Sequence, residues 1–163
     1  MPHTDVPFRI GLGYDSHRLG SGGPLRLAGI NVPADVHAIG HSDADVVLHA
    51  LTDALLGALA QPDIGRLFPD TASENKDRDS QDFLSEARSR VVQSGYHIAN
   101  LDVVILAQKP KLSDYMETMR GQLADSLSLQ LDQVGIKAKT GEKVDAIGRG
   151  EAIASRVVIM LYR

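Results

Sequence analysis

The stretch His41-Ser-Asp-Ala-Asp-Val-Val-Leu-His49 and the apolar sequence that follows it decide the fold. Apolar residues recur at helical spacing until Gln61-Pro62 interrupts the pattern, at Val47, Leu48, Leu51, Leu55, Leu56 and Leu59. Ser42 or Asp43 is expected to cap the first turn, because either side chain can accept a backbone N–H. The stretch therefore predicts a helix that follows a loop and carries two imidazoles and two carboxylates at its start.

Strands and further helices are predicted on both sides of this helix. Apolar patterns indicate strands at residues 8–14, 96–107, 134–140 and 153–161, with a short hairpin at 25–33. Helical spacing indicates two more helices at residues 79–95 and 113–127, and the polar residues 63–79 are expected to form a long loop. This order predicts one α+β domain over residues 1–163, with a mixed β-sheet and helices packed on one face.

Composition narrows the class of protein. The chain has 163 residues, 43% of them hydrophobic and 23% charged, and no apolar run approaches the length of a membrane span. Its start has neither the basic nor the apolar region of a secretory signal, so we expect a cytoplasmic protein without membrane contact. A net charge of −4 and 4% aromatic residues, with no basic stripe, argue against nucleic acid as a partner.

Histidines and carboxylates are concentrated near the predicted helix. Four of the six histidines lie between residues 17 and 49, and the chain has no cysteine, so any metal must be held by nitrogen and oxygen. Asp15 and His17 end the first apolar run and share a face if the strand continues to them, and His49 can join them from the helix. Two histidines, one aspartate and an open position form a catalytic metal site. Spacing alone leaves a structural role for each histidine open, because no standard metal motif is present.

Lysines follow two of the predicted strands. Lys109 and Lys111 come directly after strand 96–107, and Lys137, Lys139 and Lys143 surround Thr140-Gly-Glu142. Such groups at strand ends suit phosphate binding, although each loop taken alone is more typical of a solvated surface. The sequence contains no P-loop, no complete dinucleotide fingerprint and no G-x-S-x-G elbow, which disfavours those enzyme classes.

Six motifs occur together along the chain, in the order Gly13-Tyr-Asp-Ser-His17, His41 to His49, Asp63-Ile-Gly65, Phe68-Pro-Asp-Thr71, Ala107-Gln-Lys-Pro-Lys111 and Gly148-Arg-Gly-Glu151. From about Arg9 to the last strand, the chain closely resembles the 2-C-methyl-D-erythritol 2,4-cyclodiphosphate synthase family. The resemblance implies conversion of 4-diphosphocytidyl-2-C-methyl-D-erythritol 2-phosphate to 2-C-methyl-D-erythritol 2,4-cyclodiphosphate and CMP. This is a metal-assisted intramolecular phosphoryl transfer in the non-mevalonate route to isoprenoid precursors.

The resemblance also implies how the site is assembled. It implies a homotrimer with active sites between subunits, zinc on Asp15, His17 and His49, and magnesium or manganese on the diphosphate near Glu142. His41 and Thr140 match positions that stabilise the transition state. Around the substrate, the implied contacts besides the metal ligands are His41 and Ser42, Asp63 and Gly65 at the ribose, Ala107, Lys111, Lys139 and Thr140 at the cytidine diphosphate, and the covering loop of Phe68, Asp70 and Thr71.

Two further points stay open on the sequence. Arg149 is implied to lie beside the threefold axis, where it could bind an isoprenoid diphosphate or be neutralised by Glu151. The same metal ligands would also suit a metal-dependent phosphatase or nucleotide pyrophosphatase, and a binding protein for zinc or an isoprenoid diphosphate would need no reaction at all. The reaction product distinguishes these alternatives.

Overall fold

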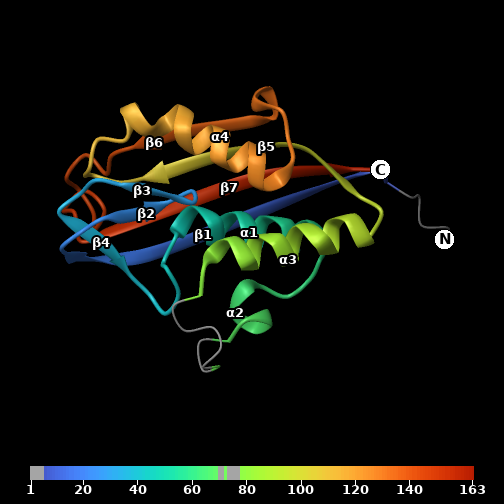
Figure 1. Ribbon diagram of the computed structural model, residues 1–163, viewed down its shortest axis with the longest axis horizontal. Coiled ribbons are helices and arrows are strands. Elements are labelled where there is room, and N and C mark those ends of the chain that lie inside the picture. Colours follow the sequence, from blue (N-terminus) through green and yellow to red (C-terminus); the bar gives the residue numbers. More distant parts are fainter. Residues whose placement is uncertain (1–5, 70–71, 73–77) are drawn as a thin grey trace.

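The computed structural model describes residues 6–69, 72 and 78–163 and has a mixed five-stranded sheet with helices against it (Figure 1). The order across the sheet is β4-β1-β7-β5-β6, and all neighbours are antiparallel except β5 and β6. The strands are β1 (Phe8–Ser21), β4 (Val36–Ile39), β5 (His97–Leu106), β6 (Val134–Lys139) and β7 (Ala152–Tyr162). The predicted mixed α+β fold is therefore confirmed.

The helices α1, α3 and α4 lie on the same side of the sheet (Figure 1). The remaining elements are α1 (Val46–Ala58), α2 (Ile64–Leu67), α3 (Ser80–Gln93), α4 (Met116–Leu127), the 3-10 turns η2 (Ser113–Tyr115) and η3 (Leu131–Gln133), and the hairpin strands β2 (Leu25–Leu27) and β3 (Ile30–Val32). α1 is buried on nearly all sides, since apolar residues from Val46 to Leu56 have almost no exposed surface. It therefore forms the centre of the core between the sheet and α3.

The N-cap of α1 is Asp45, so the predicted cap at Ser42 or Asp43 is wrong. The Asp45 carboxylate accepts the N–H groups of Val47 and Leu48 in the helix, and also those of Ala28 and Gly29 at 2.9 and 2.7 Å in the β2–β3 turn. Burial raises the pKa of this carboxyl even though the N–H groups favour its ionised form. Two of these donors come from the hairpin, so the spacing of residues around the helix start could not identify the cap.

Three further elements differ from the prediction. β1 continues past Tyr14 to Ser21, because it pairs with β7 and then with the short edge strand β4, which the sequence patterns did not reveal. The predicted loop after residue 63 begins with α2, whose first N–H, on Ile64, is accepted by Asp53 at 2.8 Å. The helix predicted from Ser113 begins as a 3-10 turn and becomes α-helical at Met116. These short elements depend on contacts with distant residues.

Helix α1 approaches β1 so closely that only glycine fits at two strand positions. A Cβ added to Gly11 would lie 1.8 Å from the Ala54 carbonyl oxygen, and one added to Gly13 would lie 1.7 Å from that of Ala50. Because Gly13 is two residues before Asp15, the same close approach brings the helix to the part of the strand that carries Asp15 and His17.

Replacing Gly13 with alanine is expected to lower the free energy of unfolding by about 3 kcal/mol or more, because backbone atoms of α1 must move to admit the methyl group. Gly57→Ala is the matched control, since its added Cβ lies 3.8 Å from the nearest atom and alanine favours a helix. Urea denaturation of both variants measures the difference. Equal stability of the two variants would contradict this packing.

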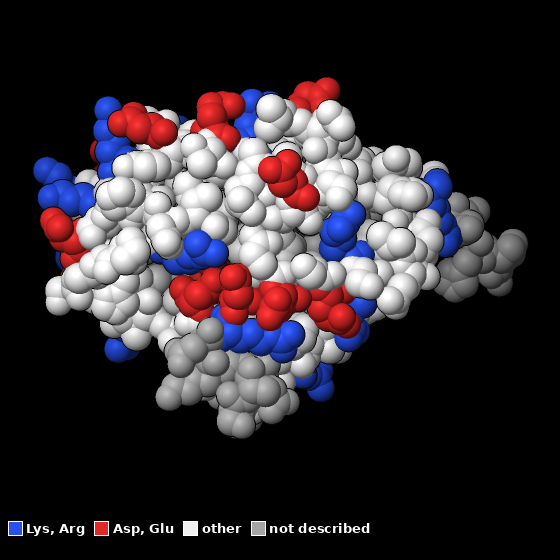
Figure 2. Space-filling view, viewed as in Figure 1, with Lys and Arg blue, Asp and Glu red and all other residues white. Residues whose placement is uncertain are grey.

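The face covered by α3 carries a row of acidic side chains bordered by basic ones (Figure 2). Arg78 pairs with Asp82 and Arg90 with Glu86 along α3, and Arg26 lies 3.8 Å from both Asp43 and Asp79. Among the described residues of this face, the opposite charges therefore compensate one another. Within the described part of the chain, no helix combines the length and apolarity needed to cross a membrane.

Candidate active site

Asp15, His17 and His49 meet beside the second half of β1. Asp15 Oδ2 lies 3.0 Å from His17 Nε2 and 3.0 Å from His49 Nδ1, and the two ring nitrogens are 3.2 Å apart. The two β1 residues share a face because strand side chains alternate, and α1 brings His49 over that face. Ligands about 2.1 Å from a tetrahedral zinc ion lie about 3.4 Å from one another, so these donors fit such an ion with a small expansion.

The charges of this cluster also favour a cation. Burial opposes ionisation of Asp15, but hydrogen bonds from His17 and His49 outweigh it and hold the pKa of the Asp15 carboxyl well below its usual range. Burial lowers the pKa of His17, but the hydrogen bond and charge of Asp15, together with the Ile39 carbonyl and the charge of Asp45, raise it overall. The ionised carboxylate between two imidazoles can therefore attract either protons or a divalent metal ion.

Both imidazoles also have polar neighbours outside the cluster. The backbone carbonyl of Ile39 in β4 favours the protonated form of His17. His49 Nε2 lies 3.0 Å from Ser42 Oγ and 2.8 Å from Ser80 Oγ. Neither Ile39 nor Ser80 belongs to a sequence motif that marks this site, and both are brought there by packing.

A cavity of about 310 Å³ opens beside the cluster. Besides the three candidate metal ligands, it is lined by Gly40, His41, Ser42, Ile64, Gly65, Phe68 and Phe83. His41 Nε2 is buried and has no hydrogen-bond partner among the described residues, so it is available to a ligand. Asp63, two residues before Gly65, caps α2 and accepts the N–H of Arg66 at 2.9 Å. Most of the residues predicted to contact the methylerythritol phosphate and the ribose therefore lie beside this cavity. We call this cavity and the cluster of Asp15, His17 and His49 the metal side of the chain.

A second, larger cleft of about 1210 Å³, here called the basic cleft, has four lysines among its lining residues. Its walls come from residues 33–36, the loop 107–113 after β5, and residues 136–140 at the end of β6. Ala107, Lys111, Lys139 and Thr140 are all among them, together with Lys109, Lys137 and Asp35. Glu142 follows this cleft and accepts a hydrogen bond from Thr140 Oγ1 at 3.2 Å.

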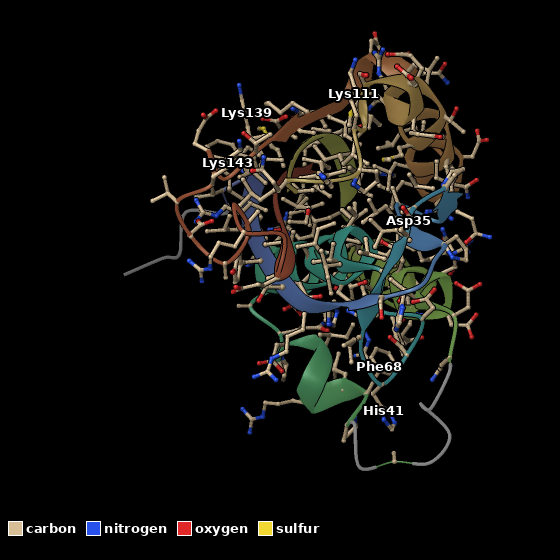
Figure 3. All side chains as sticks on the ribbon, turned by 90° about the vertical axis from the view of Figure 1, so that its left-hand side faces the viewer. Asp35, His41, Phe68, Lys111, Lys139 and Lys143 are labelled. Carbon is tan, nitrogen blue, oxygen red and sulfur yellow. The ribbon has the colours of Figure 1, made fainter. Side chains whose placement is uncertain are left out.

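The two groups of predicted residues are separate in one chain. Figure 3 shows Lys111 and Lys139 on one part of this end of the molecule and His41 and Phe68 on another, well apart. Arg149 lines neither cavity; it is exposed and forms two hydrogen bonds with Glu151, at 2.9 and 3.0 Å. Asp70 and Thr71, predicted for the covering loop, lie outside the described residues.

Comparisons with known proteins give one consistent result. A sequence model of the YgbB family matches residues 8–162. The 2-C-methyl-D-erythritol 2,4-cyclodiphosphate synthase of Rhodopirellula baltica is 65% identical over 158 residues, which cover 97% of this chain and 95% of that protein. A solved synthase of the same name, in a CDP-bound form, has a TM-score of 0.88 at 39% identity and matches 94% of this chain and 99% of its own. The Plasmodium falciparum IspF complex with CDP has a TM-score of 0.85 at 34% identity, over 96% of each chain.

Proposed function

The chain belongs to the YgbB family of 2-C-methyl-D-erythritol 2,4-cyclodiphosphate synthases, and from this premise we propose which of its residues carry out the reaction. Formation of the cyclodiphosphate in isoprenoid biosynthesis, a lyase reaction, is the activity of the chain. The assignment of residues rests on the cluster of Asp15, His17 and His49. The cavity beside it is lined by His41, whose buried Nε2 has no hydrogen-bond partner among the described residues.

Asp15, His17 and His49 hold zinc in this proposal, because two imidazoles and one carboxylate are ligands that zinc accepts at this spacing. Glu142, beside Thr140, holds magnesium or manganese on the diphosphate, because these ions prefer oxygen ligands. The bound ions supply positive charge that lowers the repulsion between the substrate's phosphates.

The protein groups then position the substrate rather than attack it. The 2-phosphate is itself an anionic nucleophile, so its oxygen attacks the β-phosphorus and CMP leaves without a protein nucleophile. His41 Nε2 and Ser42 contact the methylerythritol phosphate, while Lys111 and Lys139 neutralise the diphosphate and Thr140 donates to the charge that develops on it. Asp63 and Gly65 contact the ribose, Ala107 borders the cytosine, and Phe68 helps to cover the substrate.

A complete site needs two chains, because the metal side and the basic cleft do not meet within one. The CDP seen in two solved relatives supports placing cytidine diphosphate in the basic cleft.

The sheet face opposite the helices carries exposed apolar side chains in register, with Leu12 opposite Val158 and Ile10 opposite Met160. Leu12 and Ile10 are 68% and 65% exposed, which is unusual for neighbouring strand residues and supports burial in a homotrimer. The chain acts as one domain, in the cytoplasm.

Phosphorus NMR of the reaction products tests this function against hydrolysis. The purified protein with zinc and magnesium should convert 4-diphosphocytidyl-2-C-methyl-D-erythritol 2-phosphate to CMP and a cyclic diphosphate. A metal-dependent phosphatase or pyrophosphatase would release linear monophosphates instead. A zinc or isoprenoid-diphosphate binding protein would leave the substrate unchanged.

The proposed isoprenoid diphosphate on the threefold axis must compete with an internal partner of Arg149. The hydrogen bonds and charge of Arg149 lower the pKa of Glu151, so this carboxylate is ionised and already neutralises the guanidinium. Geranyl diphosphate is expected to bind the trimer and to bind less to Arg149→Ala, as measured by native mass spectrometry. Equal binding by the two proteins would eliminate Arg149 as its site.

A further inference from the structure

Ser80 lies behind the candidate metal ligand His49, on the side away from Asp15 and His17. The imidazole of His49 directs Nδ1 toward those two residues and Nε2 toward Ser80 Oγ, 2.8 Å away. Ser80 is the first residue of α3 and is fully buried. Ser80 therefore contacts the candidate metal ligand His49 without lining the cavity, and it has no role in the reaction described above.

Asp43 fixes the direction of the hydrogen bond between Ser80 and His49. The Asp43 carboxylate forms a short hydrogen bond with Ser80 Oγ and accepts the backbone N–H of Ser80 at 3.2 Å. Because an ionised carboxylate only accepts, the Ser80 hydroxyl proton is directed to Asp43. The lone pairs of Ser80 Oγ then remain for a proton on His49 Nε2.

The proton on His49 decides whether this residue can bind a metal ion. A neutral imidazole has one proton, and only the nitrogen without it can coordinate. Asp15 Oδ2 lies 3.0 Å from His49 Nδ1 and would accept a hydrogen bond from a proton placed on that nitrogen. His49 Nδ1 could then no longer coordinate a metal ion, and the same hydrogen bond would use one lone pair of the Asp15 carboxylate. The hydroxyl of Ser80 favours the other arrangement, with the proton on Nε2 and a free lone pair on Nδ1.

We propose that Ser80, held by Asp43, is a positioning residue that keeps the proton of His49 on Nε2 and so presents Nδ1 to the metal ion. The inference rests on the proposed metal site. Metal-bound histidines commonly donate their second N–H to an oxygen acceptor, and the carbonyl of Ile39 has the same place beside His17. Ser42, also 3.0 Å from Nε2, accepts the N–H of Ala44 and faces the cavity, so the buried contact is that of Ser80.

Two readouts on Ser80→Ala test this role. Zinc affinity, measured by competition with a chelator, is expected to fall about 10- to 100-fold. In the metal-free protein, nitrogen NMR of the imidazoles at alkaline pH is expected to show the proton of His49 on Nε2 in the wild type and shifted toward Nδ1 in the variant. Ser89→Ala, about two and a half turns further along α3, is the control and should match the wild type in both measurements. Unchanged zinc affinity or an unchanged tautomer in Ser80→Ala overturns the proposal.

Asp43→Asn provides a second test that keeps Ser80 in place. The amide can donate to Ser80 Oγ, which frees the hydroxyl proton to point at Nε2, so zinc affinity should again fall and the tautomer should shift the same way. If Ser80→Ala does not fold, Asp43→Asn alone tests the proposal. A zinc affinity of Asp43→Asn equal to that of the wild type would overturn it. Failure of the proposed metal site can be distinguished from failure of the role of Ser80. If the metal site is wrong, wild type and His49→Ala will bind zinc equally, and the tautomer measurement still tests Ser80.

Discussion

Turnover of the His49→Ala variant is expected to fall roughly a thousandfold, because the loss of a ligand removes several kcal/mol of charge stabilisation by the metal. His49 Nδ1 is one of three donor atoms within 3.2 Å of one another, so its removal leaves two protein ligands. The helix should persist, since alanine is a strong helix former and α1 is held by its apolar residues. Zinc content by atomic absorption, measured with turnover and circular dichroism, tests the expectation.

Two other histidine variants separate loss of metal from loss of a contact. His41→Ala should retain zinc and turn over slowly, because His41 lines the cavity without belonging to the cluster. His97→Ala should retain both zinc and activity, since His97 begins β5 at the end of that strand away from the lysine loop. Full zinc occupancy and normal turnover in His49→Ala would refute the ligand assignment. Loss of zinc from His41→Ala would show that the two histidines have been assigned the wrong roles.

Mixing two inactive variants is expected to restore about a quarter of wild-type activity if sites are shared around a trimer. Asp15→Ala damages the metal side and Lys111→Glu damages the basic cleft, which are separate in one chain. In every mixed trimer, one of the three interfaces joins an intact metal side to an intact cleft. About three quarters of randomly assembled trimers are mixed, which gives the expected quarter. Activity after joint unfolding and refolding, at equal amounts of each chain, measures it.

The matched control combines Asp15→Ala with His49→Ala. Both residues belong to the same cluster in one chain, so no interface between these two variants contains a complete set of ligands. Their mixture should stay inactive at every ratio. No recovery in verified mixed trimers of the first pair, or an active monomer by sedimentation, would contradict shared sites.

Local patterns predicted the main elements of the fold because they reflect neighbours along the chain. The apolar spacing after His41 predicted the helix now seen as α1, and the alternation before Asp15 predicted the first strand. The cap of that helix was predicted wrongly, because Asp45 is held partly by the distant N–H groups of Ala28 and Gly29. The edge strand β4 and the short helix α2 were missed because each is too short for a periodic signal.

The sequence by itself determined which chemical groups are present and which family they belong to. Motif order identified Asp15, His17 and His49 as candidate ligands, and the absence of cysteine limited those ligands to nitrogen and oxygen. Only the tertiary structure decided that these three atoms lie about 3 Å apart, that the basic cleft is separate from them, and that Ser80 stands behind His49. Ser80 is 31 residues from His49 and 37 from Asp43. Contacts at such separations depend on how helices pack on the sheet, which the spacing of residues along one element does not encode.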